Sequence, residues 1–395
     1  MKTTIYDTIR AIYRIIVKLK LLIRIQCASS EDIVISFFGN KLKHDQIVTG
    51  GFVKLFHLKN NYKSSNECFN ILYLVSSALP PYAEEWISIA KSKGIKVIWN
   101  QNGVAYPAWA GDNYNEINAV RKNLIHRSDY VIYQSIFCKN SSDIYLGDFK
   151  GGKSVIYNCV DTEVFKNFNR GKRRTPFTIL VTGSHHQRER VLLSIEILKR
   201  LRDSGNEFEM IIAGKYLWKP AAGFLDALEE AVAYAKEACV YEYVDFLNAY
   251  TQEAAPELYN RAHVLLHLKY NDPCPTVPIE AMACGVPVVA SACGGMPELL
   301  GKKGGILLPV EQSYEKQFYP TAKDACQAIV ELSLNWNNAS LLARDRALLF
   351  DRVPWIKSHD IIFRELLLSP PGSVPTQIVM EEKLPREFQA NQWPQ

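Results

Sequence analysis

Two short apolar runs, separated by loops rich in proline and glycine, constrain this chain more than any other stretch. The first run, His263 to Lys269, is long enough for a buried parallel strand and too short for a helix. Prolines interrupt the chain after it, Ile279 to Cys284 is predicted to form a short helix, and Val286 to Ala290 a second strand. Gly294-Gly295 then leads into another predicted helix at Pro297. The order is strand, loop, helix, strand, loop, helix.

This order has a chemical consequence. Right-handed crossovers between parallel strands put both loops at the carboxyl edge of one sheet, together with both helix N-termini. Free N–H groups and helix dipoles at that edge favour a bound anion such as phosphate. Asp272 in the loop and Glu280 at the predicted helix start flank this spot. Because carboxylates only accept hydrogen bonds, they suit the hydroxyls of a ribose or a sugar, and the combination indicates a nucleotide-sugar.

The same residues carry a family resemblance. Asp272 and Glu280 form a D-x7-E pair that runs into IEAMACGVPVVASACGGMPEL, and the similarity extends upstream through YVDFLNAYTQEAAPELYNRAHVLLHLK. This stretch resembles the E-x7-E region of family 4 of the retaining glycosyltransferases. The resemblance implies the GT-B fold, an α/β architecture in which two Rossmann-like domains, each with a doubly wound parallel sheet, face each other across a cleft.

The resemblance also implies roles for individual residues. Glu280 would hold the nucleotide ribose, Asp272 would hold donor-sugar hydroxyls, and the loop amides of Pro275, Thr276 and Val277 would lie near the diphosphate. Two departures are visible: the first acid is aspartate rather than glutamate, and Cys274-Pro275-Thr276 stands where the family usually has a glycine. Taken alone, the two acids would more often be a loop residue and a helix-favouring residue.

The second domain is predicted to start with a strand at Phe177 to Gly183, followed by SHHQRER and a helix over Val191 to Leu201. The resembled family places an arginine and a lysine near this loop, against the donor diphosphate. Ser184 occupies the customary arginine position, so Arg188 and Arg190 are the candidates for that role. The alternative for each is a solvated surface arginine.

Three strand ends complete the expected donor-binding set. Gly183 ends the first strand of the second domain, and Lys215 ends the strand that begins at Glu209. Leu247 ends a strand where the resemblance implies that the backbone meets the nucleotide base. No G-x-G-x-x-G follows any of these strands, which counts against a dinucleotide oxidoreductase.

The first domain shows strands that alternate with helical patterns, as a doubly wound sheet requires. The expected strands are Ile33 to Gly39, Asn70 to Ser77, Ile95 to Asn102, Asp129 to Ser135 and Lys153 to Asn158.

Two spots in the first domain are candidate ligand contacts. Gly50 and Gly51 precede a predicted helix from about Phe52, and such a pair permits close backbone approach to the donor; a simple turn is the alternative. Asn102 is the candidate catalytic residue where the resembled family often has a histidine, although an Asn before Gly103 also forms turns. An asparagine donates and accepts hydrogen bonds but does not exchange a proton near neutral pH.

The expected domain boundaries follow from VIYNCVDTEVF, which resembles the segment that ends the first domain in the family, and from the charged run KNFNRGKRR after it. We expect a first domain over 1–168 and a donor-binding domain over 169–350. Helices are expected at 322–334 and 341–350, and a last helix over 351–368 is expected to cross back to the first domain. The proline-rich residues 369–395 are expected to form a disordered tail.

The first 28 residues are expected to contain a basic amphipathic helix. Between Ile5 and Ile25, aliphatic residues alternate with Arg10, Arg14, Lys18, Lys20 and Arg24. The stretch lacks the uninterrupted apolar core of a signal peptide. Such a helix can lie on an anionic membrane surface, or it can be an ordinary solvated helix packed on the first domain.

Composition bounds the remaining possibilities. The 395 residues, 48% of them hydrophobic, suffice for two domains with their own cores. A net charge of +5 gives no reason to expect nucleic-acid binding. Nine cysteines without a CxxC pair fit a reducing cytosol, and no apolar stretch approaches the ~20 residues that span a bilayer. We expect a cytoplasmic protein that can bind peripherally to the inner face of the membrane. We expect no metal and no resident cofactor.

The combined expectation is a retaining glycosyltransferase that moves a sugar from a nucleotide-diphosphate sugar to a hydroxyl of a glycan or lipid-linked acceptor. Bacterial polysaccharide or glycolipid assembly is the expected setting, following the habit of the family. Two alternatives stay open. One is an enzyme of the same fold that epimerises a UDP-sugar at C2, and the other is a catalytically silent scaffold that binds a nucleotide or a glycan.

Overall fold

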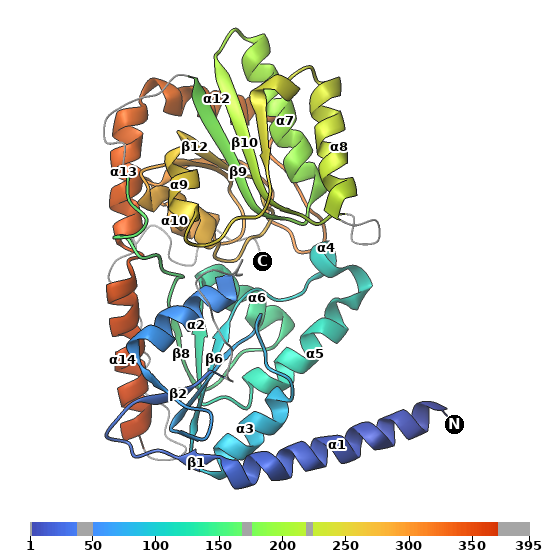
Figure 1. Ribbon diagram of the computed structural model, residues 1–395, viewed down its shortest axis with the longest axis vertical. Helices are drawn as coiled ribbons and strands as arrows, with labels where there is room; N and C mark the ends of the chain where they lie inside the picture. Colours follow the sequence, from blue (N-terminus) through green and yellow to red (C-terminus); the bar gives the residue numbers. More distant parts are fainter. Residues whose placement is uncertain (1, 38–49, 168–175, 219–223, 370–395) are drawn as a thin grey trace. The chain divides into compact units, whose positions relative to one another are not determined.

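The computed structural model describes residues 2–37, 50–167, 176–218 and 224–369, and Figure 1 labels its elements. The chain divides into two compact units. Unit 1 comprises residues 1–42, 49–157 and 353–395, and unit 2 comprises residues 43–48 and 158–352. Each unit contains a six-stranded sheet in which all pairings are parallel, so the predicted pair of Rossmann-like α/β domains is confirmed.

The sheet of unit 1 has the strand order β3-β2-β5-β6-β7-β8, and β1 pairs with β4 beside it. The strands are β1 (Gln26–Cys27), β2 (Val34–Ser36), β3 (Lys63–Ser64), β4 (Cys68–Phe69), β5 (Ile71–Val75), β6 (Lys96–Gln101), β7 (Tyr130–Tyr133) and β8 (Gly152–Val155). The helices are α1 (Lys2–Arg24), α2 (Gly50–Asn61), α3 (Ala83–Ser92), α4 (Pro107–Ala110), the 3-10 turn η1 (Gly111–Asn113), α5 (Tyr114–Ile125), α6 (Ile136–Tyr145) and α14 (Arg352–Leu368).

The central strands of unit 1 are buried on both faces. Every residue of β5 (ILYLV) and of β7 (YVIY) is buried. A continuous run of aliphatic and aromatic residues, without alternation, is the pattern of a parallel strand covered by helices on both sides. The apolar runs at these positions are the reason why the strands could be located from the sequence.

The sheet of unit 2 has the order β11-β10-β9-β12-β13-β14. Its strands are β9 (Phe177–His185), β10 (Phe208–Tyr216), β11 (Val244–Leu247), β12 (Val264–His267), β13 (Val288–Ser291) and β14 (Gly305–Leu308). Its helices are α7 (Arg188–Asp203), α8 (Phe224–Glu237), the 3-10 turn η2 (Tyr241–Tyr243), α9 (Ala255–Asn260), α10 (Thr276–Ala283), α11 (Met296–Leu300), α12 (Ala322–Leu334) and α13 (Trp336–Leu348).

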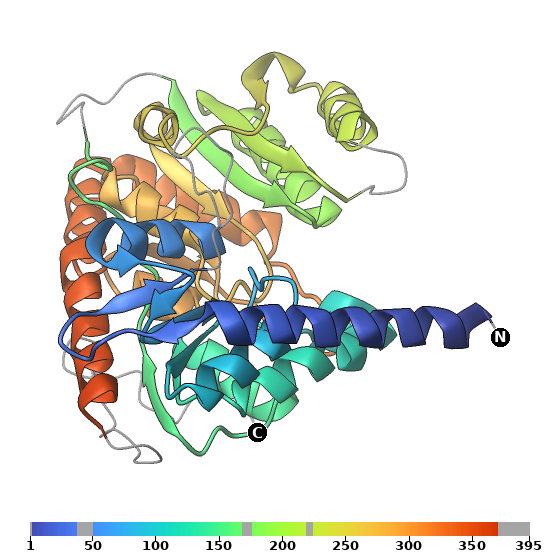
Figure 2. The same cartoon turned by 60° about the horizontal axis from the view of Figure 1, so that its bottom comes forward.

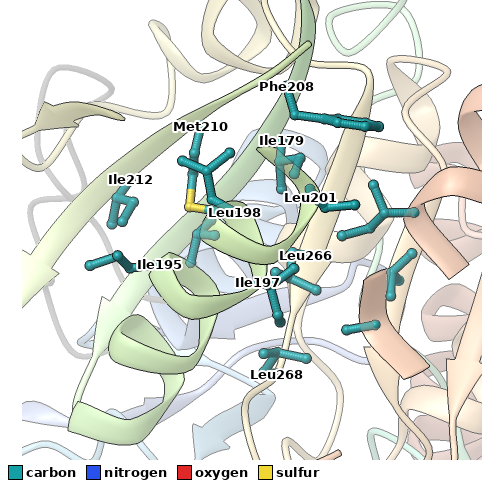
Figure 3. Close-up of a cluster of buried hydrophobic side chains, with 14 of the residues drawn as sticks. Ile179, Ile195, Ile197, Leu198, Leu201, Phe208, Met210, Ile212, Leu266 and Leu268 are labelled. Atoms are coloured by element: carbon teal, nitrogen blue, oxygen red, sulfur yellow. The ribbon is translucent and has the colours of Figure 1, made fainter. Parts of the chain in front are cut away.

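The core of unit 2 lies between α7 and one face of the sheet (Figure 3). Ile195 and Leu198 of α7 are fully buried, as are Ile179 of β9 and Leu266 of β12. Burying one such side chain contributes roughly 1.5–3 kcal/mol relative to leaving it exposed. This packing fixes the carboxyl ends of β9 and β12, which carry the candidate site.

The division between the units falls between Tyr157 and Asn158, earlier than the boundary at 168 expected from the charged run. The segment that follows joins the second unit through its backbone: Val160 donates its N–H to Phe350 O at 3.0 Å and accepts from Arg352 N at 2.9 Å. Thr162 Oγ1 also donates to the Asp351 carboxylate at 2.6 Å. The VDT segment therefore belongs to unit 2, and residues 168–175 of the expected linker lie outside the described residues.

The last described helix, α14, belongs to unit 1 from Val353 onward. Tyr73 in β5 and His359 in α14 are hydrogen-bonded, with 3.1 Å between the hydroxyl oxygen and Nε2. The rings of Tyr62 and Phe363 also pack edge to face. The expected tail from residue 370 onward lies outside the described residues.

The sequence pattern predicted the bounds of α12 correctly but placed the start of α13 too late. α12 spans the expected residues 322–334, whereas α13 starts at Trp336, earlier than the expected 341. Asn335 lies between the two helices, and Trp336 is buried with its indole N–H donating to His263 O at 2.7 Å. This tertiary contact, which periodicity does not encode, anchors the first turn of α13.

The predicted amphipathic helix near the N-terminus is present as α1. Its C-terminal half lies against α3, and both views show its N-terminal part extending away from the other elements of unit 1 (Figures 1 and 2). None of the helices in the described residues is apolar over enough of its length to span a bilayer.

Candidate functional site

The candidate site of unit 2 is built at the carboxyl ends of β9, β12 and β13, which are neighbours in the sheet. The loops after β12 and β13 touch through their backbones, because Gly295 N donates to Asp272 O at 2.8 Å. A Cβ atom at Gly294 would come within 2.6 Å of the same carbonyl oxygen, and Gly294 has φ +64°. Only glycine allows this close approach, so the Gly294-Gly295 pair fixes the backbone that presents Asp272.

A third loop braces this arrangement from the side of β14. Gln312 donates through Nε2 to Asn271 Oδ1 at 2.6 Å and accepts from Gly294 N at 3.0 Å. The Asn271 side chain in turn donates to Ser313 O at 2.8 Å. The loops after three adjacent strands are therefore tied together around Asp272.

The helix that carries Glu280 begins earlier than predicted. α10 starts at Thr276, so Glu280 is in its second turn and not at the helix start. The prolines explain the error: Pro275 precedes the helix in extended conformation, and Pro278 lies in the first turn, where its missing N–H has no intrahelical partner to lose. Pro275 and Pro278, which the sequence analysis took to interrupt the chain, therefore lie at the start of the helix.

Glu280 is buried and hydrogen-bonded through both oxygens. Gln252 Nε2 donates to Oε1 at 2.9 Å, and the Tyr259 hydroxyl donates to Oε2 at 2.7 Å. The Thr276 hydroxyl, in the first turn of α10, also favours the ionised form of this carboxyl. Burial raises the pKa of Glu280, while these three donors act in the opposite direction. Because a carboxylate has about four acceptor positions, Glu280 retains capacity for ligand hydroxyls.

Asp272 is held in its ionised form. Lys269 Nζ lies 2.9 Å and His267 Nε2 3.5 Å from its Oδ2 atom. Burial alone would raise the pKa of Asp272, but the charge of Lys269, with smaller contributions from His267, holds it well below its ordinary value. His267 is buried, and burial lowers its pKa to about 4, so the ring is neutral at neutral pH.

The two candidate arginines have different surroundings. Arg188 forms an ion pair with Glu230 of α8 and is exposed. Arg190 is buried, with Nη2 donating to Thr182 O at 2.6 Å, and its Nε atom has no hydrogen-bond partner within the part of the chain described. Burial lowers the pKa of Arg190 to about 10, and the nearby Asp272 charge opposes that shift. Arg190 is therefore a buried cation near Asp272 and not a solvated surface residue.

The other predicted donor contacts occupy strand ends and the start of α10. A Cβ at Gly183 would lie 3.7 Å from Val277 Cγ2, which places the end of β9 beside the first turn of α10. Lys215 pairs in register with Ser184 across β10 and β9. Leu247 ends β11 opposite Ala213, farther along the sheet.

Unit 1 contains a buried polar network around the predicted residue Asn102, which directly follows β6. Lys54 Nζ donates to Asn100 Oδ1 at 2.8 Å and to Asn102 Oδ1 at 3.0 Å. Gln134 also donates to Asn102, whose own amide donates to Ser77 Oγ. Lys54 lies on α2, which begins at the predicted glycines Gly50 and Gly51.

The residues of these clusters that sequence reasoning missed include Lys54, Gln252, Tyr259, His267 and Lys269. All but His267 lie on helix or loop positions without a distinctive motif. His267 offered a signal, because a histidine at the end of an apolar strand must be buried at a carboxyl edge. Within the described ranges, no group of three or more His, Cys, Asp or Glu side chains is arranged to hold a metal ion.

Part of the chain is similar in sequence to known proteins. Residues 164–317 match the family Glycosyl transferases group 1. The D-inositol 3-phosphate glycosyltransferase of Mycobacteroides abscessus is 26% identical over 163 residues, which cover 40% of this chain and 36% of that protein. The protein of the same name from Mycobacterium sp. (strain KMS) is 33% identical over 102 residues, covering 26% of this chain and 22% of that protein. The matched segments thus span about a third or less of these relatives.

Solved structures resemble the chain over more of its length. The structure of Anabaena Alr3699/HepE in complex with UDP-glucose has a TM-score of 0.63 at 17% identity and covers 84% of this chain and 98% of that one. Sucrose-phosphate synthase from Thermosynechococcus elongatus has a TM-score of 0.61 at 16% identity, covering 80% and 77% of the two chains. With its two parallel-sheet domains, the chain has the fold of GT-B glycosyltransferases.

Proposed function

We propose that this chain, which carries a glycosyl transferases group 1 segment over residues 164–317, is a retaining glycosyltransferase that uses a nucleotide-diphosphate sugar. The observation that carries the proposal is the placement of two buried carboxyl groups, Asp272 and Glu280, on either side of the first turn of α10. The family match and the fold agree with it.

Each group has a distinct part in donor binding. Glu280, with its remaining acceptor capacity, accepts from the ribose hydroxyls, and ionised Asp272 accepts from hydroxyls of the donor sugar. The backbone N–H groups of Thr276 and Val277 open an eight-residue helix and have no intrahelical acceptor, so they can donate to the diphosphate. Gly183 leaves the end of β9 free of a side chain beside them.

Catalysis then rests on orientation and on stabilising the leaving group. Glycosidic bond cleavage leaves negative charge on the diphosphate, and amide donors together with nearby cations stabilise that charge. Arg190 contributes a buried positive charge close to Asp272. No carboxylate nucleophile is needed if the departing phosphate takes the proton of an acceptor hydroxyl on the same face of the sugar. Metal-independent transfer to a glycan or lipid-linked acceptor, as in bacterial polysaccharide or glycolipid assembly, is part of the proposal.

UDP-sugars are the first donors to test, because Alr3699/HepE, a structure of the same fold, holds UDP-glucose. A thermal-shift screen of UDP-, GDP- and ADP-sugars should find at least one that raises Tm, as any ligand specific for the native state does. The matched variants are Glu280→Gln and Glu257→Gln, the latter at an exposed glutamate of α9. We expect the shift to be lost in the first and kept in the second.

Product analysis separates transfer from its alternatives. Incubation with the selected donor and no acceptor would yield a free epimer from a UDP-sugar 2-epimerase. A silent scaffold would bind the donor without hydrolysing or transferring it. Nucleoside diphosphate release that depends on an added acceptor supports the proposal, and either of the other outcomes contradicts it.

A further inference from the structure

Among the side chains that the structure describes, helix α1 packs on unit 1 through one face. Arg14 forms ion pairs with Glu84 and Glu85 at the start of α3. Val17 and Leu21, on the same side of the helix, are half-buried, and Ile25 directly after it is fully buried. These contacts define which way the helix faces the domain.

The opposite face is a continuous apolar surface. At about 100° per residue, seven large aliphatic side chains fall on one side of the helix and away from the packed face. Each of them is between 42% and 79% exposed. We call this surface the apolar arc; it consists of Ile9, Ile12, Ile15, Ile16, Leu19, Leu22 and Ile23.

An apolar arc of this size calls for a partner. Isolated exposed aliphatic residues are normal on protein surfaces, but contiguous apolar patches mark interaction sites. The N-terminal part of α1 also extends away from the other elements of unit 1 in both views (Figures 1 and 2).

The charges beside the arc indicate the chemistry of that partner. α1 carries six basic residues and one acid in its sequence KTTIYDTIRAIYRIIVKLKLLIR. Arg14 is paired with α3 and Arg24 with Glu67, whereas Lys18 and Lys20 are exposed at the two borders of the arc. An apolar face bordered by lysines matches an anionic lipid surface, in which acyl chains lie beneath negative headgroups.

A second copy of α1 fits this surface less well. A two-helix seam uses a narrow stripe of positions with oppositely charged residues beside it, whereas this arc spans about 140° of the helix circumference. Two such helices would also place lysines and arginines against each other, with one aspartate per helix to offset them. We propose that α1 docks the chain on an anionic lipid surface, with the arc in the interfacial region and the helix axis parallel to the membrane.

This inference deepens the proposed function by placing the enzyme where a lipid-linked acceptor would be, and it is tested without turnover. Flotation of the full-length chain with phosphatidylcholine vesicles, alone or mixed equally with phosphatidylglycerol, measures the docking directly. We expect binding to the mixed vesicles only, weakened when the salt concentration is raised above about 0.1 M, where charges are screened beyond ~10 Å.

Two matched pairs of double variants and one single variant make the test specific. Ile16→Ser with Leu19→Ser should weaken vesicle binding about 100-fold, whereas Leu341→Ser with Leu348→Ser, exposed leucines of α13, should not change it. Lys18→Gln with Lys20→Gln should weaken it at least tenfold, and Lys303→Gln with Lys323→Gln should not. Glu280→Gln should lose donor binding and keep vesicle binding, so the two proposals fail separately.

Each other outcome overturns the lipid assignment. Equal binding to neutral and anionic vesicles, no binding to either, or binding that survives the changes in the arc would contradict it. If light scattering instead shows a dimer that Ile16→Ser with Leu19→Ser dissociates, a second copy of the chain covers the arc.

Discussion

Tyr259 of α9 donates its hydroxyl to Glu280 Oε2 at 2.7 Å, inside unit 2 where both side chains are buried. The bond joins the helix before β12 to the helix after it, so α9 sets the orientation of the carboxyl group that we assign to the ribose. Burial raises the pKa of Glu280, and the Tyr259 hydrogen bond limits that rise. Both α9, through Tyr259, and α10, which carries Glu280, therefore determine how this carboxyl group is oriented for a ligand.

Replacing Tyr259 with phenylalanine should weaken donor binding without unfolding the chain. A hydrogen bond to a charged group is worth about 1.5–3 kcal/mol, so the dissociation constant for the donor should rise roughly tenfold or more. Calorimetric titration of Tyr259→Phe measures this change. An unaltered affinity would show that Tyr259 does not orient Glu280.

Removing the Glu280 charge should cost binding and leave stability intact. The folded-state pKa of Glu280 lies above its unfolded value, so ionisation opposes folding at neutral pH, and the relative stability is greatest below the unfolded pKa. The unfolding free energy of Glu280→Gln at pH 7 should therefore lie within about 1 kcal/mol of the wild-type value, while donor affinity is lost. Urea denaturation checks the first expectation, and a loss of several kcal/mol would mean that Glu280 is structural.

The Lys269–Asp272 pair predicts the opposite pH dependence. The folded-state pKa of Asp272 is depressed, so its stabilisation is present above the unfolded pKa of about 3.9 and is lost as pH falls through the lower folded value. Lys269 is partly exposed, so Lys269→Met should cost only about 1 kcal/mol at pH 7. The difference from wild type should shrink in acid as Asp272 is protonated, and a difference that is constant with pH would contradict the ion-pair assignment.

Buried histidines should make the chain sensitive to mild acid. Burial lowers the pKa of both His267 and His359 to about 4, so their neutral forms stabilise the fold above the unfolded pKa near 6.5. This stability is lost as pH falls from about 6.5 towards 4. His359→Gln should flatten the decline in the unfolding free energy over that range by roughly 1–3 kcal/mol, and an unchanged slope would show that His359 is protonated in the native state.

The network of unit 1 should affect turnover rather than donor affinity. Lys54 holds the Asn102 side chain at 3.0 Å, and Asn102 is our candidate catalytic residue. Lys54→Met and Asn102→Ala should each lower kcat about tenfold or more and leave the donor dissociation constant unchanged, because the side chains that we assign to the donor hydroxyls, Asp272 and Glu280, lie in unit 2. Weaker donor binding in either variant would contradict this division of roles.

The sequence was sufficient to predict the architecture because both sheets are built from fully buried apolar strands such as β5 and β12. The sequence also predicted that Asp272 and Glu280 lie at one edge of the sheet, because the strand–loop–helix order determines the edge at which the loops emerge. It misplaced the start of α10, because Pro278 is tolerated in a first turn, where no intrahelical bond is lost.

Contacts made through space could not be predicted in this way. Whether Arg190 pointed into solvent or into the domain depended on packing between α7 and the strand ends. Lys54 and Asn102 are far apart in the sequence, and neither belongs to a periodic pattern that requires the other. In the sequence, Tyr259 and Gln252 resemble ordinary helix and loop residues. Their hydrogen bonds to Glu280 are visible only in the folded structure.

The most direct test of the central claim is calorimetric titration of the donor found by thermal shift into the wild type, Asp272→Asn and Glu280→Gln, with Glu257→Gln as control. If Asp272 and Glu280 bind donor hydroxyls, each replacement should raise the dissociation constant at least tenfold while the control binds as the wild type does. Unchanged donor affinity in both Asp272→Asn and Glu280→Gln would contradict the account.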